Sequence, residues 1–128
     1  MSVSRAHLHS MRQSARKVRI VLDLIRGKSV DEAYRILAFH PRRSAEPMLK
    51  LLKSAVANAG QKEAGKAAGL YVSRAFADQG FAFRKVEPRA MLRHGIMKRR
   101  TCHVTIEIDE MGARKAGKAA PQGAEVKA

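Results

Sequence analysis

A strongly basic stretch, residues 83–103, runs directly into a segment with the alternation of a β-strand. Residues 84–100 carry seven Lys or Arg side chains and a single acid, Glu87. Burying so many charges without partners would cost on the order of several kcal/mol or more. In residues 101–108, apolar and polar side chains alternate strictly, which is the period of a half-buried strand. The apolar positions are Cys102, Val104, Ile106 and Ile108. The two segments together predict a cationic arm that leaves the core and returns to it as a strand.

The composition indicates a partner that carries negative charge. The chain of 128 residues has a formal net charge of +15 and a pI near 11.0, and basic residues occur in nearly every segment. Nucleic acid is the first expectation and an anionic membrane surface the second. Aromatic residues make up only 5% of the chain and Trp is absent. Base stacking is therefore not expected to be the main mode of binding.

The length suits one domain with a modest core. The N-terminal residues show no apolar signal region, and no apolar run approaches the roughly 20 residues that cross a bilayer. A single cysteine excludes an internal disulfide and is compatible with a reducing compartment. We therefore expect an intracellular protein that is not inserted in a membrane.

The motifs of common enzyme and metal sites are missing from the sequence. It contains no Walker loop, no G-x-G-x-x-G, no CxxC pair and no H-E-x-x-H. Cys102 falls on the apolar side of the predicted strand, which favours a packed thiol over a nucleophile. His7 and His9 would share one face of a short N-terminal strand, but no Cys or acidic cluster nearby completes a metal site. We expect no enzyme activity, no metal and no other cofactor.

A first helix is predicted after Ser14, with Gly27 as the residue that ends it. Its buried stripe follows helical spacing and consists of Val18, Val21, Leu22 and Ile25. Basic residues gather near the opposite side, namely Arg12, Arg16, Lys17, Arg19 and Arg26. Such a face is often merely solvated, but the excess of charge in the other segments favours contact with phosphates. Asp23 is spaced to pair with Arg19 or Arg26.

Two more helices are predicted in the first half of the chain. Ser29 and Glu32 have the spacing of a capping box, and Pro41 closes the short helix that follows. Ser44 can cap the third helix. The inward positions are Val30, Ala33, Ile36 and Leu37 in the shorter helix and Met48, Leu52, Ala55 and Ala59 in the third.

The second half of the chain predicts strands. Residues 60–69 are expected to form a flexible loop. The strand that follows, at residues 70–77, has Leu70, Val72 and Phe76 on one face. The Asp-Gln-Gly triplet at 78–80 predicts a turn or a bulge before the arm.

Two residues of the arm constrain its backbone. Pro88 lacks an amide donor and belongs at a sheet edge. Gly95 has free access to positive φ and is the predicted point of reversal. After residue 110 the Ala-, Gly- and Lys-rich tail cannot build a core and is expected to be disordered on its own.

Five segments, in this order, closely resemble the large-subunit ribosomal protein twenty-two family. They are SARKVRIVLDLIRGKSVDEA at 14–33, AEPMLKLLKSAVANA at 45–59, LYV at 70–72, PRA at 88–90 and KRRTCHVTI at 98–106. The match is ordered, spans roughly residues 5–110, and is highly specific when its parts are taken together.

The resemblance implies an α+β fold, with three helices packed on a small three-stranded antiparallel sheet and a long protruding basic β-hairpin. It implies one RNA-binding ribosomal domain at residues 1–110, with the hairpin at about 81–103 and a flexible basic tail at 111–128. It also implies a structural constituent of the large ribosomal subunit, located in the cytoplasm, that binds the large ribosomal RNA, supports assembly and lines the nascent-peptide exit tunnel with its hairpin tip. Neighbouring ribosomal proteins and the nascent polypeptide in transit would be further partners.

Candidate binding residues follow from the basic helix and the arm. We expect contact with ribosomal RNA from Arg12, Arg16, Lys17, Arg19, Arg26, Lys28, Arg84, Lys85, Arg89, Arg93, Lys98, Arg99 and Arg100. The expected tunnel-facing tip comprises Arg89, Ala90, Met91, Leu92, Arg93, His94 and Gly95. This tip is where the chain departs most from the family, whose tip is usually richer in Gly and Arg. Ala15 stands where the family usually has Pro, and the tail has no family counterpart.

Two other classes of protein compete with this interpretation. An architectural DNA-binding protein could insert a basic β-arm into a groove, with Met91 or Leu92 as an apolar wedge. A cationic peripheral membrane protein is the other class, but the pattern of Trp and Phe expected on an interfacial helix is not seen here. The sequence shows no dimer seam, so we expect no homo-oligomer.

Overall fold

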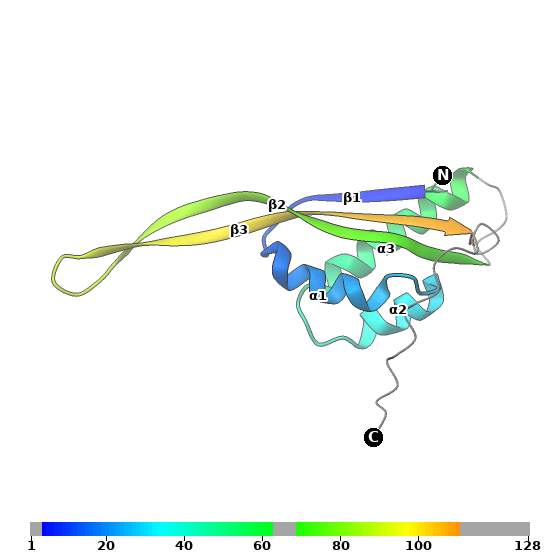
Figure 1. Cartoon of the computed structure of the whole chain (residues 1–128), viewed down its shortest axis with the longest axis horizontal. Helices are drawn as coiled ribbons and strands as arrows, with labels where there is room; N and C mark the ends of the chain where they lie inside the picture. The colour runs from blue at the N-terminus through cyan, green and yellow to red at the C-terminus, as the bar shows by residue number, and fades with distance from the viewer. Residues whose placement is uncertain (1–3, 63–68, 111–128) are drawn as a thin grey trace, which may run out of the picture.

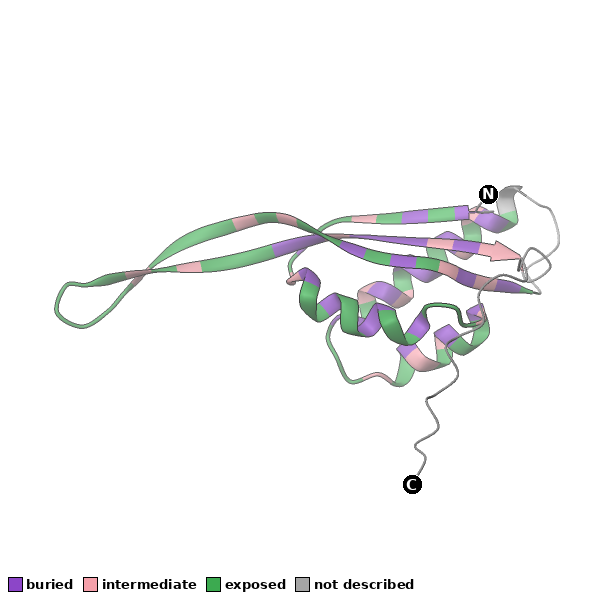
Figure 2. Cartoon of the chain, in the orientation of Figure 1, coloured by how far each residue is buried: buried purple, intermediate pink, exposed green. Residues whose placement is uncertain are grey.

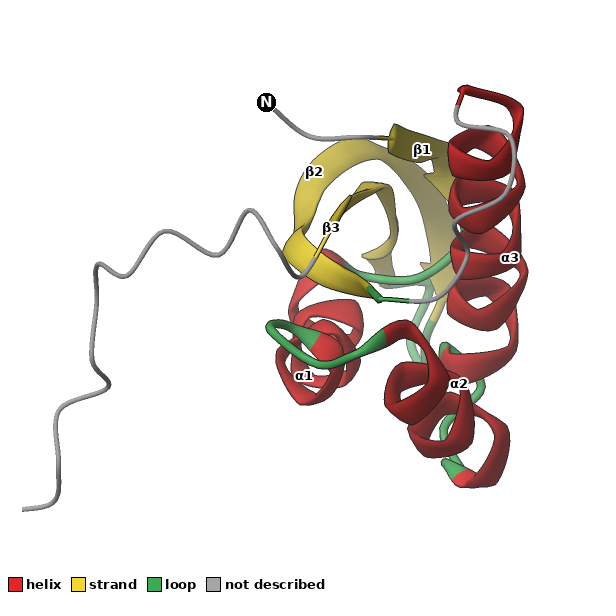
Figure 3. Ribbon diagram, turned by 90° about the vertical axis from the view of Figure 1, so that its right-hand side faces the viewer, coloured by secondary structure: helices red, strands yellow, loops and turns green. Residues whose placement is uncertain are grey.

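The fold is an antiparallel sheet with three helices against one face and a long hairpin that projects beyond them (Figures 1 and 3). The computed structural model describes residues 4–62 and 69–110. The elements are β1 (Ser4–Met11), α1 (Ala15–Ile25), α2 (Val30–Phe39), α3 (Ala45–Lys62), β2 (Leu70–Pro88) and β3 (His94–Glu110). The sheet order is β1-β3-β2. The predicted α+β class, with its sheet, helices and hairpin, is confirmed.

The core lies between the helices and the inner face of the sheet. Strand β3 is central, and its residues Cys102, Val104, Ile106 and Ile108 are all fully buried, as their alternation predicts. Helix α1 buries the predicted stripe of Val18, Val21, Leu22 and Ile25 completely. Burying a side chain of this kind contributes roughly 1.5–3 kcal/mol. These two stripes form the centre of the domain, and burial falls off along the hairpin (Figure 2).

The predicted capping residues lie at the helix ends, but they do not all make the expected capping hydrogen bonds. Ser14 is the N-cap of α1, but its side chain makes no capping hydrogen bond. Gly27 follows the C-cap of α1 with φ of 75°, as predicted. At α2, the Glu32 amide donates to Ser29 Oγ at 3.3 Å, while the Glu32 carboxylate pairs with Lys28 Nζ at 2.8 Å. The capping box is therefore half formed, because Lys28 takes the carboxylate that would have closed it.

Helix α3 extends further than predicted. It continues to Lys62, so the expected loop at 60–69 is wrong for residues 60–62. A glycine inside a helix costs only about 1 kcal/mol relative to Ala, and the packing of Leu52, Ala55 and Ala59 against the sheet outweighs that cost at Gly60. The remainder of the predicted loop, at 63–68, and the predicted tail, at 111–128, lie outside the described residues.

Strand β2 contains a bulge that changes which residues face inward. Its register against β3 shifts between Val72 and Arg74, and one extra residue in a strand reverses the alternation that follows. Ala75 and Ala77 are consequently buried, whereas Phe76 is 41% exposed. The prediction that Phe76 shares the face of Val72 is wrong for this reason.

A second register shift, between Gln79 and Ala82, marks the base of the arm. The prediction of a turn or bulge at 78–80 is confirmed as a bulge. A Cβ placed on Gly80 would lie 2.6 Å from Thr101 Oγ1, so only glycine lets the two strands approach here. The Thr101 hydroxyl donates to the Phe81 carbonyl at 2.7 Å and links the strands at the same level.

Beyond this point β2 and β3 form a two-stranded ladder, since the last partner of β1 is Cys102. The ladder runs from the pair Ala82 and Arg100 to the pair Pro88 and His94. The arm is thus an extension of the two longest strands of the sheet (Figure 1).

The arm reverses at residues 89–93. The Arg89 amide donates to the Arg93 carbonyl at 2.8 Å. Met91 and Leu92 both adopt φ of 58°, and both side chains are largely or fully exposed. Gly95 instead pairs with Glu87 in the ladder. The prediction that the chain reverses at Gly95 is wrong, because two non-glycine residues take the left-handed conformation that the turn requires.

Candidate nucleic-acid interface

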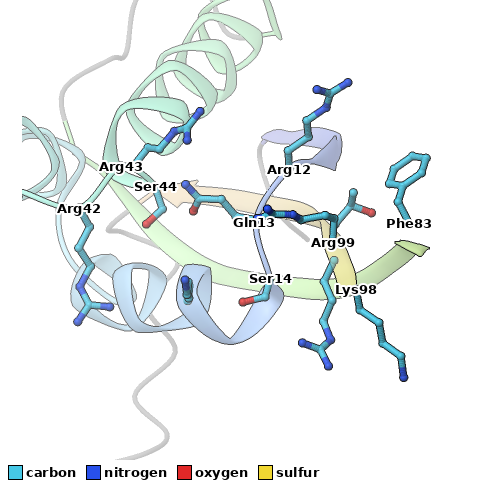
Figure 4. A pocket seen from close by; sticks show the side chains of 12 residues that line it. Arg12, Gln13, Ser14, Arg42, Arg43, Ser44, Phe83, Lys98 and Arg99 are labelled. Atoms are coloured by element: carbon cyan, nitrogen blue, oxygen red, sulfur yellow. The ribbon is translucent and has the colours of Figure 1, made fainter. Parts of the chain in front are cut away.

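A cationic groove of about 1010 Å³ lies where the arm meets the helices (Figure 4). It is formed by the end of β1 and the start of α1, by the link from α2 to α3, and by the base of the arm. Its lining residues are Arg12, Gln13, Ser14, Lys17, Arg42, Arg43, Ser44, Phe83, Lys98, Arg99, Arg100 and Thr101. These described residues include seven Lys or Arg and no acid. Such a surface attracts phosphates strongly.

Two helices begin at this groove. Ser14, immediately before α1, and Ser44, immediately before α3, both line it. The first amides of a helix lack carbonyl partners within the helix and carry partial positive charge. Both helix N-termini therefore add to the field of the surrounding side chains in favour of an anion.

The predicted basic residues of the first helix occupy three different environments. Arg12 and Lys17 line the groove. Arg16 is exposed but does not contribute to the groove. Arg19 and Arg26 lie instead along strand β2. The basic face is therefore divided between the groove, the solvent and the sheet edge.

Arg19 and Arg26 hold α1 against the edge of the sheet. Arg19 donates from Nε and Nη2 to the carbonyl of Ala77, at 3.0 and 2.8 Å. Arg26 donates in the same way to the carbonyl of Ala75, at 3.3 and 2.7 Å. Because β2 is an edge strand, these carbonyls are available to side chains. Arg26 also pairs with Asp23 at 2.6 Å, which is one of the two predicted pairings.

The arm contributes lining residues to the groove, most of them from its returning strand, β3. Lys98, Arg99 and Arg100 line it together with Phe83 from the outgoing strand. Arg84 lies in a second, adjoining hollow of about 720 Å³. Further out, Arg89 Nη2 lies 3.6 Å from Glu87 Oε2, an exposed pair that contributes little to stability. The remaining predicted residues, Lys85 and Arg93, are exposed on the outer arm.

Arg42 and Arg43 were not predicted as binding residues. They lie in the link between α2 and α3, and the structure brings them to the groove. The available signal was a pair of arginines directly before a helix N-terminus, a place where anions bind readily. Phe83 was also missed as part of this surface, because the sequence does not show that the base of the arm lies beside the start of α1.

The Cys102 thiol and the histidines of the sheet are the groups that could suggest a catalytic or metal site. Burial raises the pKa of the Cys102 thiol, an effect that the charge of Arg19 only partly opposes. The thiol thus stays protonated and is a poor nucleophile. His9 lies between His7 and His103 on the outer face of the sheet, with ring centroids 6.2 and 5.5 Å away. Within residues 4–62 and 69–110, no group of three or more His, Cys, Asp or Glu side chains is arranged to hold a metal.

A family model for "Ribosomal protein L22p/L17e" matches residues 6–109, which cover both the groove and the whole arm. The chain belongs to this family. The L22p/L17e family is the one that the ordered motifs resemble, so that prediction is confirmed.

Curated relatives support the same conclusion at high identity. The chain is 50% identical over 107 residues to the large ribosomal subunit protein uL22 of Thermoanaerobacter sp. (strain X514), with 84% of this chain and 96% of the relative covered. It is 47% identical over 106 residues to the uL22 protein of Heliobacterium modesticaldum, covering 83% and 76% of the two chains. It is 40% identical over 113 residues to that of Cutibacterium acnes, covering 88% and 74%.

Membership in the L22p/L17e family makes the chain a ribosomal structural protein and not an enzyme. Within the described ranges, no helix is long and apolar enough to cross a membrane.

Proposed function

We propose that this L22p/L17e protein is a structural constituent of the large ribosomal subunit in the cytoplasm. In this role it binds the large ribosomal RNA, supports subunit assembly and lines the nascent-peptide exit tunnel with its hairpin tip. The single observation that carries RNA binding is the acid-free cationic groove at the junction of helices and arm.

The groove is the principal contact with phosphate in this proposal. Arg12, Lys17, Arg42 and Arg43 approach it from the helical side, and residues 98–100 approach it from the arm. Arginine offers paired donors that match the oxygens of one phosphate. Several such contacts spread over the groove suit the irregular surface of a folded RNA. Neutralising these phosphates releases counterions and makes binding strongly dependent on salt.

The other predicted basic residues take subsidiary parts. Arg19 and Arg26 already donate to β2, and Lys28 is paired with Glu32, so their contribution to RNA is mainly the field of their charge. Arg16 is exposed and does not line the groove, and a phosphate contact outside the groove is proposed for it. Along the arm, phosphate contacts are proposed for Arg84, Lys85, Arg89 and Arg93.

The tip is proposed to face the tunnel with residues 89–95. Its turn presents Met91 and Leu92 almost fully exposed at the far end of the arm, with φ of 58° at each. An uncharged apolar pair at the end of a cationic arm suits a surface that passes a polypeptide better than one that grips phosphate. Nascent polypeptide, ribosomal RNA and neighbouring ribosomal proteins are the proposed partners, and the protein acts as a single copy.

Duplex DNA is the competing partner for a small basic domain with a β-arm. Co-sedimentation and binding measurements at high salt distinguish ribosomal RNA from duplex DNA as the partner. We expect the full chain to co-sediment with large ribosomal subunits after a wash in high salt, and to bind duplex DNA or anionic vesicles only weakly at that salt concentration. Equal retention on duplex DNA, or release from subunits at moderate salt, would contradict the proposal.

A further inference from the structure

Two exposed phenylalanines stand together at the base of the arm. Phe81 is 72% exposed and Phe83 is 57% exposed, although both are large apolar side chains. Their ring centroids lie 5.1 Å apart and the ring planes are nearly perpendicular, at 86°. Because the rings meet edge to face and are not stacked on each other, aromatic faces remain open to a ligand.

Cations surround this aromatic pair. The hollow of about 720 Å³ beside it is lined by Phe81, Ala82, Phe83, Arg84, Lys98 and Arg100. Phe83 also lines the main groove, so the pair adjoins both depressions. The described residues lining either depression include no acid.

The local backbone fixes the pair in place. The bulge that precedes it is held by the close approach of Gly80 to Thr101, and the Thr101 hydroxyl donates to the carbonyl of Phe81 itself at 2.7 Å. Ala82 and Phe83 are then paired with Arg100 and Arg99 across the ladder. The rings are thus mounted on a defined strand and not on a loose loop, which lowers the entropy that binding must overcome.

We propose that Phe81 and Phe83 form a stacking site for unpaired RNA bases, beside the phosphate-binding groove. This inference rests on the proposed RNA-binding function and adds to it a contact with bases. Exposed aromatic rings flanked by Arg and Lys are the arrangement by which proteins hold single-stranded nucleic acid, with rings against bases and cations against the backbone. A protein partner is disfavoured because the three cations that line the hollow, with no acid among its lining residues, would repel most surfaces other than acidic ones.

The base-stacking site modifies one expectation from composition. With few aromatics in the chain, base stacking was not expected to be the main mode of binding, and the groove remains the main source of affinity here. The site adds a preference for unpaired bases at one position, at the point where the arm leaves the domain.

The test measures binding of the full chain to a single-stranded oligoadenylate and to an abasic oligomer of the same length. In the double variant Phe81→Leu/Phe83→Leu, which keeps apolar volume and removes the rings, affinity for oligoadenylate is expected to fall about tenfold. Affinity for the abasic oligomer and the slope with salt are expected to stay unchanged. The matched control is Phe39→Leu, since Phe39 is 88% exposed on α2 and lines neither depression.

A second variant gives a direct signal. The chain contains no Trp, so Phe81→Trp introduces a single indole whose fluorescence is expected to be quenched by oligoadenylate and not by the abasic oligomer. Unchanged affinity in the Leu double variant together with unchanged indole fluorescence would overturn the inference. So would an equal loss of affinity for both oligomers, or normal RNA binding combined with failure to enter ribosomal subunits, which would indicate a protein contact. If the unmodified chain showed no salt-dependent binding to ribosomal RNA, the proposed function itself would be overturned.

Discussion

The guanidinium of Arg19 donates two hydrogen bonds to the carbonyl of Ala77, at 3.0 Å from Nε and 2.8 Å from Nη2. This contact joins α1 to the edge of the sheet, 58 residues away in the chain. It also separates two kinds of arginine on one helix. Both residues are exposed, but the guanidinium of Arg19 is bonded to β2, whereas Arg16, three residues earlier, makes no such contact in the described part of the chain.

This difference predicts effects of different size for two alanine variants. Arg19→Ala is expected to lower the free energy of unfolding by about 1 kcal/mol, through loss of the charged donor that bonds to the Ala77 carbonyl. Arg16→Ala is expected to change it by less than about 0.5 kcal/mol. Urea unfolding of both variants measures the difference. Equal stabilities would mean that the Arg19 contact with β2 contributes nothing measurable.

The groove predicts a change in the salt dependence of RNA binding. Each phosphate contact contributes roughly 0.7 to 0.9 to the slope of the logarithm of affinity against the logarithm of salt concentration. The double variant Arg42→Gln/Arg43→Gln is therefore expected to reduce the slope by about 1.5 on a ribosomal RNA fragment. The control Arg35→Gln/Lys53→Gln removes the same charge from exposed positions outside the groove and is expected to reduce it much less. If both pairs lowered the slope equally, binding would depend on overall charge and not on the groove.

The arm is expected to be dispensable for folding. Its pairing beyond Arg84 and Lys98 involves only β2 and β3, and the core lies elsewhere. Replacing residues 85–97 with Asn-Gly joins these two partners by a two-residue hairpin turn. Cooperative unfolding should persist in the shortened protein, with a Tm within a few degrees of the full chain. A broad, non-cooperative transition would show that the arm is part of the folding unit.

Cys102 gives a prediction about pH. Burial raises the pKa of its thiol in the folded protein. The folded state thus favours the protonated form, so this contribution to stability is present below the thiol's unfolded pKa and is lost as pH rises through the higher folded pKa. Near pH 8, alkylation of the native protein is expected to be slower than that of the urea-unfolded protein by at least about a hundredfold, since reaction must await opening of the core. Equal rates would contradict the burial of this thiol.

Much of the core was predictable from the sequence because periodicity reports burial directly. Cys102, Val104 and Ile106 alternate through a regular ladder, and each is buried as expected. Phe76 was misplaced because the bulge after Val72 reverses the alternation, and nothing in the local composition marks that bulge. A hydrophobic pattern predicts a face only while the register is unbroken.

The binding surface was less predictable than the core. A helical wheel places Arg19 and Arg26 together with the other cations, but it cannot show that an edge strand offers its carbonyls to them. Arg42 and Arg43 join the groove only through the packing of α3 against the sheet. The position of the turn was also not predictable from composition, since Met91 and Leu92 adopt the positive φ that was expected of Gly95. Tertiary contacts decided the outcomes for the arginines, whereas the turn is set by local hydrogen bonds such as that from the Arg89 amide to the Arg93 carbonyl.

We propose that the cationic groove holds ribosomal RNA while the arm reaches the peptide tunnel. A density map of the large ribosomal subunit that contains this chain, at a resolution showing side chains, tests it most directly. We expect RNA phosphates within hydrogen-bonding distance of Arg12, Arg43 and Arg99, and we expect Met91 and Leu92 at the wall of the tunnel. A groove that faces solvent or another protein, or a tip that is buried in RNA away from the tunnel, would contradict it.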